Sequence, residues 1–275
     1  MRSLAALLLL AGVARAQDAR TLAWKLAEGD KAAVSWTAVG RAKVVVEGRT
    51  LLSYDFTQEL SGKLSVASVL RDGRAECLVS PRKHELKGKM RTLPFHLLVE
   101  DGDLVEAKGF DTGRKDLRKI ATEPIWLKVA ANGTYAVEGS EEVVKFFANQ
   151  DSVIGPDLPS TALKAGDEWK TALMLVDAKE FGMKGLTGTY RLAGFERHAD
   201  ADCAKITMDE TQDAMLKSVK VRNEIKREAF FDPAAGRCLK AKKSWRISGS
   251  AELDGQEGSV DMEFTVEFRL EPIRK

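Results

Sequence analysis

The chain has 275 residues, of which 44% are hydrophobic and 31% charged, and this composition excludes a wholly disordered protein. Its 43 Lys and Arg residues face 41 Asp and Glu residues, and two of the basic residues, Arg2 and Arg15, lie in an N-terminal leader, so the remainder carries 41 charges of each sign. This balance argues against a nucleic-acid-binding protein, which needs a basic surface.

The first 16 residues have the pattern of a signal peptide. Arg2 gives a basic start, Leu4 to Val13 form an apolar run, and Ala14-Arg15-Ala16 matches a cleavage site, so the mature chain is expected to begin near Gln17. The apolar run of about ten residues is too short to span a bilayer. We therefore expect an exported protein, periplasmic or extracellular after cleavage near Ala16, with no transmembrane segment.

Residues 17–150 are predicted to form an N-terminal β half. Apolar residues alternate with polar ones at Val34 to Ala38 and at Tyr54 to Phe56, as in strands with one buried face. Asp72-Gly73, Asp101-Gly102 and Asn132-Gly133 are typical of hairpin turns, the last joining Ile125–Ala130 to Thr134–Val137.

One helix and one linker separate this half from the next. Glu141 to Asn149 is predicted as a helix, because Ser140 can cap it and its apolar residues share one face. The linker is placed at residues 151–162, where Ile154 to Ser160 contains two prolines and a glycine.

Residues 163–275 are predicted to form a C-terminal β half with a meander topology. Val260 to Glu271 alternates for twelve residues, and Leu239 to Ile247 alternates less strictly. The turn Asp254 to Gly258 lies between these two runs, and Val219 to Phe231 is a further strand upstream. Met208 to Lys226 fits a strand or a helix.

Three segments of the first half are similar in sequence to three segments of the second half, in the same order. Trp24–Asp30 resembles Leu163–Trp169, Leu70–Cys77 resembles Phe195–Cys203, and Asp103–Lys108 resembles Arg237–Lys242. A duplication would give two similar halves, forming curved half-barrels or a sandwich, whereas the alternative is that hairpins of any β protein resemble one another.

Several of these features also resemble those of known groups of β proteins. The leader, Trp24 to Asp30, the Asn132-Gly133 turn, Leu158-Pro159 and Gly166-Asp167-x-Trp169 resemble uncharacterised secreted bacterial β proteins, catalogued as domains of unknown function. Long strands with one or two short helices are also similar to the lipoprotein-carrier (LolA/LppX-like) superfamily. That resemblance implies a curved antiparallel sheet, covered by helices, around a hydrophobic ligand cavity, and it assigns no site residue.

No motif assigns a catalytic, cofactor or metal site. Ser80-Pro81-Arg82-Lys83 matches the S-x-x-K pattern of serine acylases, but the companion S-D-N and K-T-G motifs are missing. His198, Asp200, Asp202 and Cys203 cluster in sequence, yet alternate acidic residues in a turn are usually solvated. The sequence therefore predicts no enzyme, no cofactor and no metal.

Two histidines and one local basic patch are near these motifs. His96 is expected to point to solvent from a strand, and His84 is expected in a basic loop. The patch is either a solvated loop or a surface for an anionic lipid or polymer. It consists of Arg82, Lys83, Lys87, Lys89 and Arg91.

The cysteines are too few and too scattered for a disulfide framework. Cys203 and Cys238 are expected on strands two apart, about 9.6 Å from each other, whereas a disulfide tolerates at most about 7 Å between Cα atoms. We therefore predict that Cys77, Cys203 and Cys238 are all free thiols.

The sequence as a whole favours an exported, non-enzymatic β protein. The predicted helix is only about 13 Å long, which is little cover for the apolar faces of so many strands. The preferred interpretation is an apolar or lipid-like ligand in a sheet-lined cavity. The alternative is an envelope structural or protein-interaction module with a dry core and no ligand.

Overall fold

The computed structural model describes residues 19–110, 122–139, 155–172, 187–216, 219–253 and 256–272, and these form thirteen strands. The strands of the first half are β1 (Lys31–Val46), β2 (Arg49–Val69), β3 (Ala75–Met90), β4 (Leu93–Glu100), β5 (Asp103–Lys108), β6 (Ile125–Val129) and β7 (Tyr135–Glu138). Those of the second half are β8 (Glu168–Ala172), β9 (Thr187–His198), β10 (Ala201–Leu216), β11 (Val219–Asp232), β12 (Arg237–Leu253) and β13 (Gln256–Pro272).

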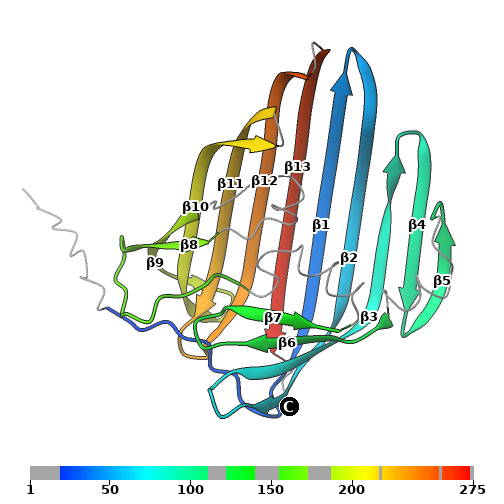
Figure 1. Ribbon diagram of the computed structural model, residues 1–275. Coiled ribbons are helices and arrows are strands. Elements are labelled where there is room, and N and C mark those ends of the chain that lie inside the picture. Colours follow the sequence, from blue (N-terminus) through cyan, green and yellow to red (C-terminus); the bar gives the residue numbers. More distant parts are fainter. Residues whose placement is uncertain are drawn as a thin grey trace, which may run out of the picture.

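The strands build one antiparallel sheet in the order β5-β4-β3-β2-β1-β13-β12-β11-β10-β9-β8, with β6 and β7 branching from β3. The first and last long strands, β1 and β13, pair at the centre over fifteen residue positions, from Ala32 opposite Pro272 to Val46 opposite Gly258. Figure 1 shows this pair (blue and red) in the middle of the sheet. The predicted mainly β fold with long meander strands is confirmed, and the two halves join edge to edge.

Period-two alternation explains why these segments are strands with two different faces. In β1, Ala32, Val34, Trp36 and Ala38 are buried, while each residue between them is exposed. In β13, Phe268 and Leu270 are buried on the same side. We call this side the inner face. The outer face carries ion pairs such as Arg41 with Glu263, whose nitrogen and oxygen atoms lie 2.6 Å apart.

Most of the main core lies at one end of the inner face, and the core continues along that face to Val221, Ile225, Ile247 and Val260. Side chains from distant strands, including Trp36, Leu127 and Leu192, belong to one continuous cluster there. In Figure 1 the β6–β7 hairpin crosses in front of the ends of β1 and β13. We call this part of the molecule the closed end.

The segment Leu22 to Lys25 connects two turns at the closed end. The Trp24 amide donates to the carbonyl of Ala131 in the β6–β7 turn, and the Lys25 amide donates to Gly236 in the β11–β12 turn, each over 2.8 Å. Leu22 and the Trp24 ring are buried in the core below. A short segment therefore connects two turns that are remote in sequence.

Strand β3 changes partner along its length. Its residues Ala75–Val79 pair with β6, and its residues Lys83–Met90 pair with β4. Pro81 lies between the two stretches, next to an irregularity in the pairing with β2. Because proline has no amide hydrogen, it cannot continue the ladder, and the sheet divides at this point.

The turns and the ambiguous segment follow the sequence closely. Gly73 and Gly133 have φ values of 83° and 85°, which glycine adopts without steric cost. The described part of the ambiguous segment Met208 to Lys226 is extended, in β10 and β11. The leader and the predicted helix Glu141 to Asn149 lie outside the described residues.

Two turns in the two halves have the same hydrogen bonds. The carboxylate of Asp30 accepts from the Ala27 amide, and that of Asp167 accepts from the Lys164 amide, both over 2.9 Å. Each aspartate then accepts from a residue of the next strand through its carbonyl, Asp30 from Val66 and Asp167 from Leu192. The similar segments Trp24–Asp30 and Leu163–Trp169 thus also have matching hydrogen bonds.

We expect Asp30→Ala and Asp167→Ala each to lower the free energy of unfolding by about 1 kcal/mol, because each removes the carboxylate that accepts a backbone amide within the turn. Urea unfolding measures the effect. Glu28→Ala, a change at an exposed residue of the first turn, is the control and should stay within about 0.5 kcal/mol of wild type. No loss in either aspartate variant would contradict a structural role for the turns.

Candidate ligand-binding site

A row of aromatic residues and glycines crosses the inner face beyond the closed end. The register places the following residues side by side on seven neighbouring strands, from β11 to β4: Ile225, Trp245, Phe264, Gly40, Phe56, Gly88 and Phe95. We call them the aromatic row. Trp245, Phe264, Phe56 and Phe95 are half-buried, whereas Ile225 at one end of the row is fully buried and belongs to the main core. The described residues thus leave a broad apolar surface partly accessible.

Gly40 makes this surface flat. A Cβ atom at this position would lie 2.8 Å from Cδ1 of Phe264 and closer still to Cε1 of Phe56. The two rings therefore lean from the neighbouring strands over the glycine backbone, where any larger side chain would push them apart. The result is a platform of rings across three strands.

The rings of the platform contact one another. The Phe264 ring lies 5.6 Å from Trp245, 6.3 Å from Phe56 and 6.4 Å from Tyr54, measured between ring centroids. The Trp245 indole donates a hydrogen bond to the side-chain oxygen of Asn223. Burial raises the pKa of the Tyr54 phenol, as expected for a hydroxyl at the edge of an apolar surface.

Between the main core and the aromatic row lies a row with two basic residues. Arg227 on β11 and Lys243 on β12 are register partners, and Val266 on β13 follows them. The Arg227 guanidinium donates to the Tyr190 hydroxyl over 2.7 Å. The Lys243 ammonium lies 5.9 Å from the centre of the Trp245 ring, so the basic row adjoins the aromatic row.

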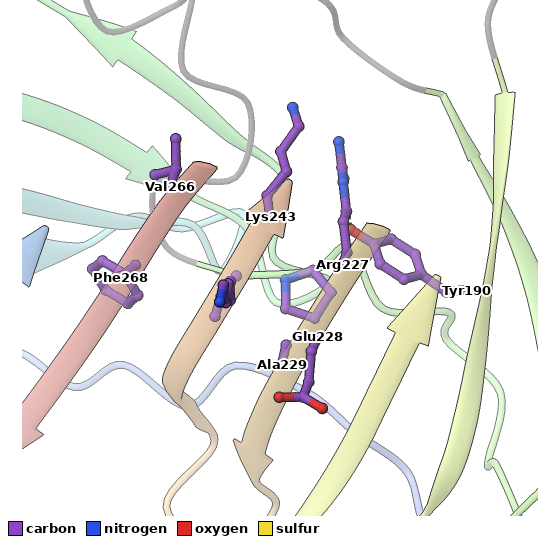
Figure 2. Close-up of a pocket in the computed structure, with 11 residues that line it drawn as sticks. Tyr190, Arg227, Glu228, Ala229, Lys243, Val266 and Phe268 are labelled. Atoms are coloured by element: carbon purple, nitrogen blue, oxygen red, sulfur yellow. Dashed lines mark hydrogen bonds between the residues drawn. The ribbon is translucent and has the colours of Figure 1, made fainter. Parts of the chain in front are cut away.

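A small depression opens beside the two basic residues. Gly155, Tyr190, Arg227, Lys243, Val266 and Phe268 are among the residues that line it, and it encloses about 20 Å³, room for one water-sized group. Figure 2 shows Arg227 and Lys243 extending to the same side of the sheet, with Glu228 on the opposite side. The depression is therefore lined by apolar side chains such as Val266 and Phe268 together with the basic side chains of Arg227 and Lys243.

The prediction that His84 lies in a loop was wrong, whereas the prediction that His96 points outward from a strand is close to what the structure shows. His84 does not lie in a basic loop but is buried on the inner face of β3, where its Nε2 is 2.8 Å from the amide nitrogen of Gln58. His96 lies half-buried on the outer face, between the carboxylates of Glu85 and Glu106 at 3.3 and 3.1 Å. Neither histidine borders the aromatic row.

The other singled-out residues do not form a site. His198 stacks on the Phe230 ring with centroids 4.1 Å apart, and Asp202 pairs with Arg20 at 3.2 Å. Within the described ranges, no group of His, Cys, Asp and Glu residues has the arrangement of a metal site. In the S-x-x-K segment, the Lys83 ammonium is bound to Glu85 at 3.1 Å.

The basic patch is spread along β3 and the turn after it, and it is partly neutralised. Lys83 and Lys87 both bind Glu85 at 3.1 Å, and Arg82 binds Asp101 at 3.3 Å. The hydrogen bonds from Lys83 and then Lys87 lower the pKa of the Glu85 carboxyl to about 2. Acidic neighbours thus balance much of this patch.

The Glu85 network predicts a defined pH dependence. The pKa of the Glu85 carboxyl is about 2 in the folded chain and 4.5 ordinarily. The stabilisation that this carboxylate contributes is therefore complete above about pH 4.5 and disappears as the pH falls towards 2. We expect Glu85→Gln to cost about 1–2 kcal/mol at neutral pH, a modest value because its lysine partners are partly exposed.

Urea unfolding of wild type and Glu85→Gln at about pH 7 and about pH 3 measures this difference, which should shrink on acidification. Glu28→Gln, at an exposed position away from the network, controls for loss of any carboxylate. A difference between wild type and Glu85→Gln that stays constant over this range would contradict the assignment.

The three cysteines are free and buried, as predicted. Cys203 on β10 and Cys238 on β12 are separated by β11, whose residue Phe231 pairs with Cys238. Burial raises the thiol pKa of Cys77 and Cys203 to about 11 and that of Cys238 to about 12. The thiolate, which is the reactive form, is therefore scarce at neutral pH.

We expect the native protein to take up no alkylating reagent within minutes near pH 7. In denaturant without reductant, all three thiols should react, and intact mass spectrometry would show three adducts. A single adduct under denaturing conditions would reveal a disulfide and would refute the prediction.

The sequence contained signals for parts of this site. Alternation in Val260 to Glu271 placed Phe264 among the inward residues, but nothing in one strand alone identifies its neighbours on other strands. Gly40 and Gly88 resemble strand interruptions in sequence. Only the register shows that each lies beside an aromatic residue.

Comparisons with known proteins show similarity at the level of fold. No protein-family model matches the chain, and no curated protein sequence matches it. A solved structure describing lipid–protein interactions in lipovitellin matches with a TM-score of 0.53 and 12% identity, covering 91% of this chain and 26% of that one. This chain thus spans about a quarter of the lipovitellin chain.

A second match carries no argument about the fold. DynF, from the dynemicin biosynthesis pathway of Micromonospora chersina, is 10% identical over 94% of this chain and 88% of that one, with a TM-score of 0.22. The lipovitellin likeness supports the predicted mainly β architecture, while membership of the uncharacterised secreted family and similarity to the lipoprotein-carrier superfamily stay predictions. Among the described residues, no helix is long and apolar enough to cross a membrane.

Proposed function

We propose that the protein is an exported, non-enzymatic carrier that binds an apolar, lipid-like ligand on the inner face of its sheet. The observation that carries this proposal is the aromatic row. It offers half-buried rings from four strands, while the inner face is buried on both sides of the row, at the closed end and at Ile247 and Val260.

The physical argument concerns apolar area. A half-buried aromatic ring retains apolar surface in water, and covering such area with an apolar ligand contributes about 25 cal/mol per Å². The rings lie on rigid, doubly paired strands, so they lose little freedom when a ligand binds. The likeness to lipovitellin, a protein whose structure describes lipid–protein interactions, supports this proposal.

The direct test is to isolate the protein from its native compartment and to record native mass spectra before and after organic extraction. A bound lipid or other apolar molecule, released by extraction, is the expected result. In a second step, the delipidated protein should bind a fluorescent fatty acid. No extractable molecule together with no probe binding would favour the alternative, a structural or protein-interaction module.

A further inference from the structure

We infer that the protein binds the surface of an anionic phospholipid membrane through the adjacent ends of its β1–β2 and β3–β4 hairpins. This inference rests on the proposed function, because it supplies the surface at which a carrier meets the source of its apolar ligand. We call this surface the hairpin rim, and it consists of the exposed apolar residues Leu51, Met90 and Leu93 and the exposed basic residues Arg49, Lys89 and Arg91.

Exposed apolar side chains are concentrated at the hairpin rim. Leu51, Met90 and Leu93 are 52%, 56% and 72% exposed. They are three of the seven large hydrophobic residues that are exposed in the described part of the chain. Single exposed hydrophobic residues are normal on a protein surface, whereas a group of them marks a site of contact with a protein or a membrane.

Arg91 holds the two hairpin ends together. Its amide donates to the carbonyl of Ser53, and its guanidinium donates to the carbonyl of Leu51 over 2.9 Å. Met90 and Leu93 are the register pair that closes the β3–β4 turn. The apolar residues thus lie on neighbouring strands at one edge of the sheet, at the top in Figure 1 and away from the β6–β7 hairpin.

The basic residues of the rim are available to an anionic partner. In the described part of the chain, neither Arg49 nor Lys89 forms an ion pair, and the Arg91 guanidinium is bound to a neutral carbonyl. Two carboxylates are close in register or in sequence, since Asp55 is the register partner of Lys89 and Glu47 lies in the β1–β2 turn. The three cations outnumber them, so the rim is complementary to a negatively charged surface.

The rim continues into the aromatic row along the inner face. Met90 pairs with Tyr54 of β2, whose ring stacks on that of Phe56 with centroids 6.1 Å apart. Leu93 is two residues from Phe95 on the same face of β4. An apolar molecule that leaves a bilayer at the rim therefore meets the rings of the row directly, which favours a membrane over a second protein as the partner.

The chemistry of a bilayer surface matches both halves of the rim. Apolar side chains that project from a turn enter the boundary between headgroups and acyl chains, and binding grows with the apolar area that they bury there. The cations beside them are attracted by anionic headgroups, at about fivefold in binding for each basic residue near the surface. We therefore expect each half of the rim to contribute to binding.

The test measures sedimentation of the protein with vesicles of phosphatidylcholine, alone or with a third of phosphatidylglycerol. Wild type should bind the anionic vesicles at least about tenfold more strongly than the neutral ones, and added salt should reduce this preference. The double variants Arg49→Gln/Lys89→Gln and Met90→Ser/Leu93→Ser should each weaken binding to the anionic vesicles by at least about tenfold.

Matched controls change the same kinds of residue elsewhere on the surface. Lys31→Gln/Lys63→Gln removes two exposed charges at the opposite ends of β1 and β2, and Val39→Ser removes an apolar side chain from the outer face. Both variants should bind anionic vesicles like wild type. Circular dichroism checks that all four variants are folded.

Three results would overturn the inference. These are equal binding of wild type to both kinds of vesicle, unchanged binding in either rim variant, and self-association that Met90→Ser/Leu93→Ser abolishes in a protein that binds no vesicles. The last result would identify the rim as a contact between two copies of the chain.

A fluorescent fatty acid separates failure of this inference from failure of the proposed function. A protein that binds the probe but no vesicles would retain the proposed function and exclude the rim as a membrane surface. A protein that binds anionic vesicles through the rim, but neither the probe nor any extractable lipid, would exclude the carrier function and support the membrane surface alone.

Discussion

Replacing Phe264 by glutamate is expected to weaken binding of a fluorescent fatty acid by at least about a hundredfold. Phe264 contacts three other rings and lies beside Gly40 at the centre of the platform. A carboxylate there would have to lose its hydration when an apolar chain covers it, which costs several kcal/mol. Titration of the probe, followed by its fluorescence, measures the loss.

The neighbouring residue provides the matched control. Glu263 is on the outer face, 44% exposed and paired with Arg41, so Glu263→Ala removes an ion pair that contributes little and should leave binding unchanged. Circular dichroism must show that Phe264→Glu is folded. Phe264→Leu, which keeps an apolar core-compatible side chain, should fold in any case and weaken binding several-fold. A folded Phe264→Glu that binds like wild type would exclude the aromatic row as the site.

The strands themselves were largely predictable from the sequence. Alternation over Val260 to Glu271 and the glycine-containing turns reflect local requirements, because one buried face and one tight turn need particular residues at particular spacings. The same reasoning left Met208 to Lys226 undecided. There, the pairing of β10 with β9 and β11 settles the conformation, and pairing is not visible in one segment.

The candidate site was not predictable, because it depends on register between strands. The pairings shift at Val44/Val45, at Ser61/Gly62 and at Phe230/Phe231, and each shift moves all later residues relative to the neighbouring strand. His84 illustrates the consequence. It follows Pro81 and two basic residues, which indicate a loop, yet the irregularity around Pro81 turns it inward opposite Leu60.

The rings of the aromatic row are less buried than the core residues on either side of them along the inner face. At the closed end, residues of the β6–β7 hairpin, of β9 and of the segment around Trp24 belong to the core, so we expect stability to be concentrated there. Across the aromatic row, the same strands carry half-buried rings. One set of strands thereby carries both fully buried core residues and partly exposed rings. This division predicts that stability and binding can be changed separately.

Phe231→Ala is expected to have the largest effect on stability. The Phe231 side chain is fully buried at the closed end, and its ring meets the Trp24 ring edge-on with centroids 5.6 Å apart. Removing a buried phenylalanine leaves a cavity among rigid strands and costs about 3–5 kcal/mol. Urea unfolding followed by tryptophan fluorescence measures this loss, with Val39→Ala, at a residue 53% exposed, as the control within about 0.5 kcal/mol.

The same variant separates the core from the site. Because Phe231 belongs to the closed end and not to the aromatic row, the fraction of Phe231→Ala that remains folded should bind the fluorescent fatty acid with unchanged affinity. Phe264→Glu should show the reverse, with lost binding in a chain that still unfolds cooperatively.

Two outcomes would contradict this separation. If Phe231→Ala lowers the free energy of unfolding by less than about 1 kcal/mol, the closed end is not the stabilising core, since well-packed cores do not tolerate such truncation. Weakened binding in its folded fraction would show instead that the two ends are energetically coupled through the strands they share.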